Sequence, residues 1–183
     1  MMREFVLLLS ALLIFACQQG NQQGESGEDL TKNTPKGQAS VVDEESEPNI
    51  LQLAVKTDDL STLVAAVQAA EIEHVLVNAG PLTVFAPVNE AFKALPPGTL
   101  DDLLKPENKQ KLAYILTNHA APGTFKGRLL KDGTTIYMAS GEYVPVQRKG
   151  DDIFVGGAKI LATVDASNGV VHLVDKIILP QKQ

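Results

Sequence analysis

The sequence contains a single cysteine, no tryptophan and few aromatic residues. Aromatic side chains make up 5% of the 183 residues, so the chain offers little of the stacking surface on which single-stranded nucleic acids bind. Nucleic acid is therefore not an expected partner. Because Cys17 has no second cysteine to pair with, an intramolecular disulfide is excluded, and the folded part must be stabilised by its apolar core.

Sequence signatures of catalysis and of metal binding are also missing. The chain has no Gly-x-Ser-x-Gly elbow, no phosphate-binding Gly-x-x-x-x-Gly-Lys loop and no His-x-x-x-His pair. The pairs Asp101-Asp102 and Asp151-Asp152 lack the ligand count of a calcium loop, and we expect them in solvated turns. We therefore expect no enzyme activity, no cofactor and no metal. One enzymatic alternative stays open, because Ser140 or Ser167 could meet a histidine in space.

Acidic charge is concentrated in one segment. The formal net charge is −6, and residues 18–48 contribute −5 of it through seven acidic residues against Lys32 and Lys36. Since Arg3 and Glu4 cancel, residues 49–183 carry only −1. The acidity therefore belongs to this segment and does not mark a binding face.

The amino terminus has the pattern of an export signal. Phe5–Ala16 is a run of 12 residues that is apolar except for Ser10. Such a run is shorter than the roughly 20 residues of a membrane-spanning helix and suits a secretory signal. Residues 14–17, Ile-Phe-Ala-Cys, resemble the bacterial lipobox, in which the cysteine is lipidated and becomes the mature amino terminus. The sequence thus predicts a signal peptide over residues 1–16 and lipid attachment at Cys17; the alternative is an unmodified cysteine in an ordinary cleavable signal.

Residues 17–47 are predicted to form a flexible acidic tether. They are rich in Gln, Gly, Glu and Ser, and their only sizeable apolar residues are Leu30, Val41 and Val42, so they cannot bury enough surface to fold. A flexible chain of this length spans roughly 30 Å. With the lipid, the tether predicts an exported domain held near a membrane of the cell envelope, at the outer membrane or cell surface, facing the periplasm or the exterior.

From Asn49 onward, apolar residues become dense and periodic. Steps of three and four residues predict helices near residues 50–54, 60–67, 89–95, 99–104 and 106–116, with side-chain caps from Asp58 or Asp59, from Asn89 and from Thr99. A period of two predicts strands over residues 82–86, 134–138, 143–148, 153–155, 159–165 and 170–179, with a hairpin turn at 149–152. Helices followed by antiparallel strands predict an α+β domain over residues 48–180, in which the helices pack on a sheet wedge, and a tail over 181–183.

Three segments together resemble the fasciclin domain. Residues 83–92, Thr-Val-Phe-Ala-Pro-Val-Asn-Glu-Ala-Phe, look like its first motif, residues 115–123 are similar to its second, and residues 168–180 match its closing strand. The resemblance covers residues 48–180 and implies a wedge-shaped domain found in secreted and surface-attached proteins that mediate adhesion to cells, matrix or glycans. It also implies structural roles for the motif residues Thr83, Phe85, Pro87, Asn89, Phe92, His119, Pro122, Gly123, Asn168, Gly169, His172 and Asp175.

The histidines could have structural or functional roles. In animal relatives a Tyr-His pair in the second motif is implicated in integrin binding; here the pair is Asn118-His119, so the ring that would anchor an interface is missing and integrin recognition is not expected. His119 ends an apolar helix before Pro122-Gly123 and is predicted to support the architecture, with a place on a binding surface as the alternative. His172, on a strand between valines, is also predicted to be structural, and His74 is expected on an amphipathic helix.

Lys126, Arg128 and Lys131 form the densest basic group, with Phe125 and Leu129-Leu130 between them. They are either the solvated edge of a buried apolar strand or a patch that pairs the sulfate or carboxylate groups of an anionic glycan or acidic protein loop. The sequence favours a membrane-anchored, non-enzymatic adhesion or binding module for an extracellular or envelope protein or glycan. The alternatives are a hydrolase-like periplasmic or surface enzyme on the same domain and an envelope structural protein without a ligand.

Overall fold

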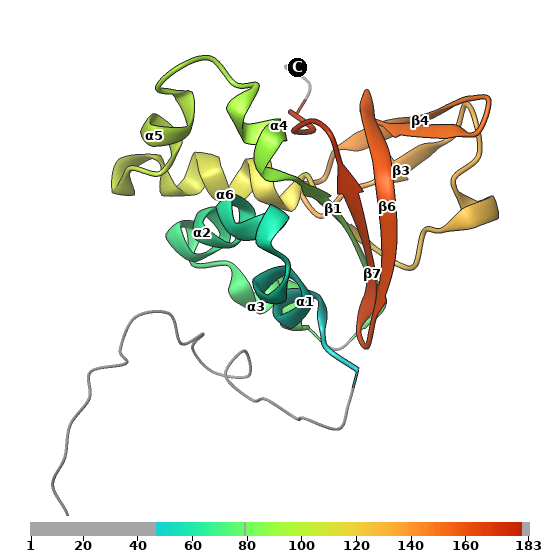
Figure 1. Cartoon of the computed structure of the whole chain (residues 1–183), viewed down its shortest axis with the longest axis horizontal. Coiled ribbons are helices and arrows are strands. Elements are labelled where there is room, and N and C mark those ends of the chain that lie inside the picture. The colour runs from blue at the N-terminus through green and yellow to red at the C-terminus, as the bar shows by residue number, and fades with distance from the viewer. Residues whose placement is uncertain (1–46, 79, 181–183) are drawn as a thin grey trace, which may run out of the picture. The chain divides into compact units, whose positions relative to one another are not determined.

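A computed structural model of the chain describes residues 47–78 and 80–180 (Figure 1). The predicted signal peptide over 1–16, lipid attachment at Cys17, the tether over 17–47 apart from Glu47, and the tail over 181–183 lie outside the described residues and stay predictions. Over the described ranges, no helix is both long and apolar enough to cross a membrane.

Helices dominate the first half of the described chain, as predicted. They are α1 (Ile50–Lys56), η2 (Asp58–Leu60), α2 (Ser61–Ala70), α3 (Glu73–Val77), α4 (Asn89–Lys93), α5 (Thr99–Leu103), η3 (Pro106–Asn108) and α6 (Lys109–Thr117), where η marks a 3₁₀ turn. A further 3₁₀ turn, η4 (Gly127–Leu129), follows in the second half. Figure 1 shows the helices α1 to α6 gathered on one side of the sheet.

The strands form one sheet in the order β2-β1-β7-β6-β5-β4-β3. Their bounds are β1 (Leu82–Pro87), β2 (Ala120–Pro122), β3 (Thr135–Tyr137), β4 (Tyr143–Lys149), β5 (Asp152–Val155), β6 (Ala158–Ala166) and β7 (Gly169–Val174). The paired strands are antiparallel except β1 and β7, which run parallel. Beyond β3, the Ala139 N–H donates to the Ala120 carbonyl of β2 at 2.7 Å, so the sheet curls towards a barrel. The predicted α+β fold class is confirmed.

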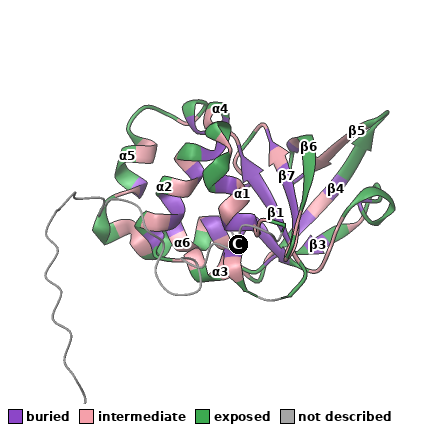
Figure 2. Cartoon of the chain, turned by 60° about the horizontal axis from the view of Figure 1, so that its bottom comes forward, coloured by how far each residue is buried: buried purple, intermediate pink, exposed green. Residues whose placement is uncertain are grey.

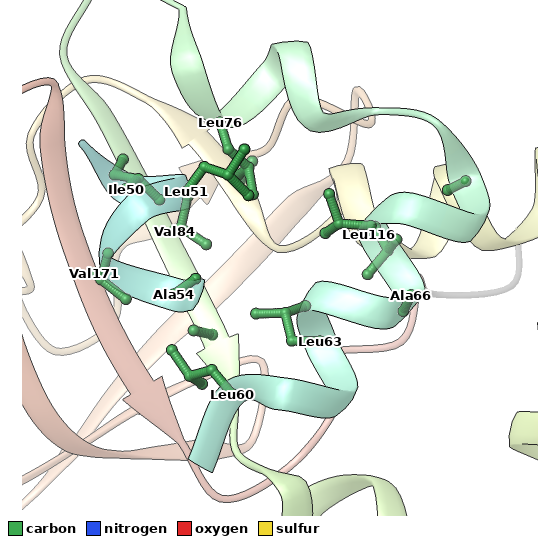
Figure 3. Packing of buried hydrophobic residues seen from close by; sticks show 14 of the residues in the cluster. Ile50, Leu51, Ala54, Leu60, Leu63, Ala66, Leu76, Val84, Leu116 and Val171 are labelled. Carbon is green, nitrogen blue, oxygen red and sulfur yellow. The ribbon is translucent and has the colours of Figure 1, made fainter. Parts of the chain in front are cut away.

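Two apolar clusters lie on opposite faces of β1 and β7. Val84 and Val171 face the helices and pack against α1, α2, α3 and α6 (Figure 3). Phe85 and Val174 face the inside of the curled sheet, where they meet residues of β3, β4 and β5. This alternation follows from the two-residue period of a strand. Figure 2 shows the result: β1 is buried along most of its length, while β6 is largely exposed.

The prediction that Asp58 or Asp59 caps α2 is wrong. Both residues belong to the turn η2, and α2 has no cap from its own neighbourhood. Instead, the Asn89 amide reaches across from α4: its Oδ1 accepts the N–H of Thr62 at 3.0 Å, and its Nδ2 donates to the Asp58 carbonyl at 3.0 Å. Tertiary packing has brought a better-placed acceptor to the free N–H groups of α2 than the local aspartates provide.

The predicted caps of α4 and α5 are also wrong. Because the side chain of Asn89 is used on α2, α4 begins after Val88 without a side-chain cap. Likewise, Thr99 does not cap α5, whose N-cap position is occupied by Gly98 with φ +81°. The predicted strand over 170–179 is also too long, since β7 ends at Val174. Asp175 ends the pairing: its carboxylate accepts the Lys159 N–H at 2.7 Å.

Candidate binding surfaces

His119 lies just after α6, and its imidazole is buried. Its Nδ1 is 2.8 Å from the Ile115 carbonyl oxygen, and its Nε2 accepts the N–H of Ile178 at 2.9 Å. A carbonyl only accepts and an N–H only donates, so the ring carries its hydrogen on Nδ1 and is neutral. Burial lowers the pKa of His119 from 6.5 to about 4, against the opposing effect of the bond to Ile115. Neither nitrogen is free for a ligand or a proton transfer.

His172 has a similar environment inside the curled sheet. Its Nε2 donates to the Phe125 carbonyl at 2.7 Å, and its Nδ1 lies 2.8 Å from the Thr163 hydroxyl. Its ring stacks on Phe85, with 5.3 Å between the centroids. Burial lowers the pKa of His172. The third histidine, His74, lies on α3 and is exposed.

Thr83 fastens the turn that follows β2. Its hydroxyl donates to the Gly123 carbonyl at 2.7 Å and accepts the Phe125 N–H at 2.8 Å. Gly123 has φ +110°, which disfavours other residues there, and its N–H bonds the Pro81 carbonyl at 2.7 Å. Pro122 pairs with Leu82 at the end of β2. These contacts join the first and second motifs.

Asn168 and Gly169 fasten the β6–β7 turn to the helices and to β1. The Asn168 Oδ1 accepts the Ile50 N–H at 2.9 Å, and its Nδ2 donates to the Leu76 carbonyl at 2.8 Å. A Cβ on Gly169 would lie 1.8 Å from the Leu82 carbonyl oxygen, so no side chain fits. Most motif residues are therefore engaged in joining elements.

Neither Ser140 nor Ser167, the two candidate nucleophiles, is hydrogen-bonded to a histidine in the described part of the chain. The Ser140 hydroxyl donates to the Asn118 Oδ1 at 2.8 Å, and the Asn118 Nδ2 donates to the Ile178 carbonyl at 3.1 Å. Ser167 lies exposed in the β6–β7 turn, and its N–H bonds the Pro48 carbonyl. The structure thus brings the Ser140 hydroxyl to an amide and gives it no histidine as a base.

The acidic pairs differ from the expectation of two solvated turns. Asp101 and Asp102 lie in α5, where a hydrogen bond and ion pair with Lys105 lower the pKa of Asp102. Asp151 lies in the predicted β4–β5 turn, but Asp152 begins β5 and its carboxylate is 2.8 Å from the Lys159 ammonium. Across residues 47–78 and 80–180, no group of three or more His, Cys, Asp or Glu could hold a metal ion.

The basic segment is not the edge of a strand, so that interpretation is wrong. Lys126, Arg128 and Lys131 are exposed around η4, where Gly127 has φ +57° and the chain makes a 3₁₀ turn. The Lys126 ammonium pairs with the Asp165 carboxylate at 2.7 Å. Arg128 and Lys131 have no ion pair with any residue that the structure describes. They are the cations of this segment best able to meet an anionic ligand.

Sequence reasoning missed an aromatic surface on the β3–β4 hairpin. Tyr137 and Tyr143 face each other across the two strands, with ring centroids 5.1 Å apart, and are 49% and 65% exposed. We call them the tyrosine pair. Tyr114 of α6 donates its hydroxyl to the Glu142 carboxylate at 2.8 Å and ties the hairpin to the helix. The alternation around Ile136 indicates an outward direction for Tyr137, but the pairing of the rings depends on the strand register.

An apolar pocket of about 320 Å³ was also missed. It lies where α4, α5 and α6 meet the segment that follows β7, and we call it the helical pocket. Leu179 contributes to it and is 58% exposed. The lining residues are Pro87, Phe92, Leu95, Pro96, Thr99, Leu100, Leu103, Lys111, Leu112, Ile115, Leu116, His119, Ile177 and Leu179.

Comparison with known proteins finds relatives along most of the chain. The sequence model of the Fasciclin domain matches residues 58–180. Protein sll1483 of Synechocystis sp. is 40% identical over 176 residues, which cover 96% of this chain and 96% of that protein. Immunogenic protein MPB70 of Mycobacterium bovis is 31% identical over 167 residues, which cover 88% of this chain and 83% of that protein.

Longer animal proteins match over the domain alone. Transforming growth factor-beta-induced protein ig-h3 of Sus scrofa is 31% identical over 134 residues, 72% of this chain and 19% of that protein. A solved FAS1 domain pair from the insect cell adhesion molecule fasciclin I has the same fold, with a TM-score of 0.65 at 15% identity. The match covers 72% of this chain and 51% of the pair. Since the family model and the Synechocystis relative both span most of the sequence, the chain belongs to the fasciclin domain family.

Proposed function

We propose that this chain is an exported, lipid-anchored and non-enzymatic binding module that recognises an extracellular or envelope protein or glycan. Adhesion as the class of function is supported by the relatives, among them an insect cell adhesion molecule. The observation that carries the proposal is the tyrosine pair, Tyr137 and Tyr143, two adjacent rings that are both about half exposed or more.

Tyrosine suits a binding surface because its ring is apolar, its hydroxyl is polar, and its ordering costs little rotamer entropy. Exposed tyrosines on a fixed backbone are common anchors of interfaces. This hairpin is held on two sides: Ala139 bonds Ala120, and Tyr114 bonds Glu142. The tyrosine pair is therefore already in place before a ligand arrives, which lowers the entropic cost of binding.

The surroundings of the histidines argue for binding and against the enzymatic alternative. Both ring nitrogens of His119 and of His172 are engaged by fixed partners. A general base needs a nitrogen that can reach a substrate proton, and neither buried ring offers one. The Ser140 hydroxyl is held by Asn118. No arrangement of these groups in the described part of the chain supports acyl transfer.

The test is binding to envelope material from the source organism. The double variant Tyr137→Ala, Tyr143→Ala should bind at least about tenfold more weakly, because it removes two adjacent anchors. Leu161→Ala is the matched control, since Leu161 is 53% exposed on another strand, β6. Equal loss in the control, or full binding by the double variant, would show that the tyrosine pair is not the binding surface.

The chemistry of the ligand is decided by treating the envelope material before binding. Protease should abolish binding if the ligand is a protein, and periodate should abolish it if the ligand is a glycan. Arg128→Glu with Lys131→Glu should reduce binding mainly at low salt if the basic segment contributes, because exposed charges are screened by salt. An absence of binding by the unaltered chain would favour an envelope structural protein without a discrete ligand.

A further inference from the structure

We propose that the helical pocket binds a free fatty acid, with the hydrocarbon chain inside the pocket and the carboxylate at Lys111. The pocket shares no residue with the tyrosine pair and lies where α4, α5 and α6 meet the segment after β7. Its volume of about 320 Å³ is at the small end of the range for ligand sites, roughly 300–1,000 Å³. The size suits a single medium-length chain.

The lining explains why the buried part of the ligand must be hydrocarbon. Apart from Thr99, Lys111 and His119, every lining residue is apolar. His119 has no free nitrogen, since Ile115 and Ile178 occupy both. A peptide segment would bring N–H and carbonyl groups into this space without partners, at a cost of several kcal/mol by transfer measurements. An alkyl chain brings no such groups.

Lys111 explains why the exposed end of the ligand should be anionic. It is the one charged residue in the lining, and it is exposed to solvent, so its charge is available to the polar end of a ligand. No ion pair joins Lys111 to the residues that the structure describes. The charge of Lys111 acts on the Asp102 carboxylate, but that carboxylate already accepts hydrogen bonds from Lys105 and Asn108. A fatty-acid carboxylate would complement the remaining charge.

The binding assay uses the full-length chain carrying Cys17→Ser, so that no attached acyl group competes. Octanoate, decanoate and dodecanoate are titrated by calorimetry below their micellar concentrations. The affinity should rise about fourfold for each added methylene, the equivalent of about 0.8 kcal/mol, until the pocket is filled. Methyl-labelled NMR spectra should show the largest shifts at Leu95, Leu112 and Ile115, which line the pocket.

Two kinds of variant test the binding of the hydrocarbon chain and the binding of the carboxylate separately. Leu100→Trp and, independently, Thr99→Trp fill the pocket and should each weaken decanoate binding at least about tenfold, while Leu161→Trp on β6 should not. Lys111→Met should remove the preference for decanoate over its methyl ester, which we expect to be about threefold because an exposed ion pair is weak. Urea melts establish that each variant is folded. Two tryptophan variants are used so that the test still works if one of them does not fold.

Three results would overturn the proposal. The first is the absence of saturable binding of decanoate and dodecanoate by the folded chain. The second is binding that neither tryptophan variant weakens, which would place the fatty acid elsewhere. The third is a concentration-dependent dimer in sedimentation velocity that Leu100→Trp dissociates, because the pocket would then be covered by a second copy. Failure of the tyrosine variants to alter envelope binding has no bearing on these readouts.

Discussion

At the scale of single residues, His119 links the stability of the domain to pH. The folded protein requires a neutral ring, because Nε2 accepts the Ile178 N–H and cannot carry a hydrogen. The pKa is about 4 in the folded state and 6.5 when unperturbed, so the unfolded chain binds more protons between these values. The contribution to stability is complete above about pH 6.5 and is lost as the pH falls towards 4. The shift corresponds to about 3 kcal/mol.

Replacing this ring should change both the size and the pH dependence of the unfolding free energy. At pH 7.5 we expect His119→Ala to lower it by about 1–3 kcal/mol, because the buried Ile178 N–H loses its acceptor. The loss should shrink between pH 6.5 and pH 5, since the variant no longer has the imidazole that titrates there. Urea melts at several pH values measure both effects. His74→Ala, at an exposed position of α3, serves as the control and should follow the unaltered chain throughout. A variant curve parallel to that of the unaltered chain would contradict this account.

At the scale of elements, the start of α2 depends on a residue far along the chain. Asn89, 27 residues beyond Thr62, accepts the N–H of Thr62 and donates to the Asp58 carbonyl. This amide therefore fastens α4, η2 and α2 together. A motif residue whose sequence position suggested a cap for its own helix has a tertiary role instead.

Asn89→Ala should lower the unfolding free energy by about 1 kcal/mol, the usual cost of losing a helix cap. Asn89→Asp should cost less, because it retains an oxygen for the Thr62 N–H and loses only the donor to the Asp58 carbonyl. Denaturant melts of the two variants test this order. Glu90→Ala, next in the same helix, is the control for a change of helix propensity. If Asn89→Asp were the more damaging substitution, the donated bond to Asp58 would be the important one.

At the scale of the whole molecule, the domain begins before the region that the family model matches. That match starts at residue 58, yet α1 buries Ile50, Leu51 and Ala54 in the apolar cluster between the helices and the sheet. Asn168 also holds the first N–H of α1 through its Oδ1. The helix is therefore part of the fold and not of the tether.

A fragment over residues 47–183 should unfold in a single cooperative transition. A fragment over 58–183 should be less stable by several kcal/mol, because burying a side chain such as Ile50 or Leu51 contributes about 1.5–3 kcal/mol. Thermal and urea melts of the two fragments compare them directly. Equal stability would mean that α1 is dispensable, and a broad melt of the longer fragment would mean that residues before 47 belong to the fold.

The membrane anchor is tested in the intact cell. Cys17→Ser should move the protein from the membrane fraction to the soluble fraction, because several acyl chains provide firm anchoring and the predicted tether contains only three sizeable apolar residues. Mass spectrometry of the amino-terminal peptide should find the acylated cysteine in the unaltered protein. Retention of the serine variant in the membrane, together with an unmodified Cys17 in the unaltered protein, would refute lipidation.

The sequence by itself determined the class of most of the longer helices and strands and the face that they bury. The two-residue period of Thr83–Ala86 assigns alternate residues to opposite sides of β1, and the structure places Val84 and Phe85 in different clusters. These properties are local, because the pleat of a strand and the turn of a helix repeat every few residues. The three sequence motifs are also local, and their resemblance to the fasciclin domain predicted the family.

Only the tertiary structure decided which distant groups meet. The partner of Asn89, the parallel pairing of β1 with β7 and the helical pocket all join segments that are separate along the chain. The contact between Tyr137 and Tyr143 is local, but it depends on the register of their hairpin. Periodicity predicts which side of an element is apolar. It does not predict which other element packs against that side, or where incomplete packing leaves a pocket. The geometry of the helical pocket is set by those long-range contacts, so it could not be read from any single stretch of sequence.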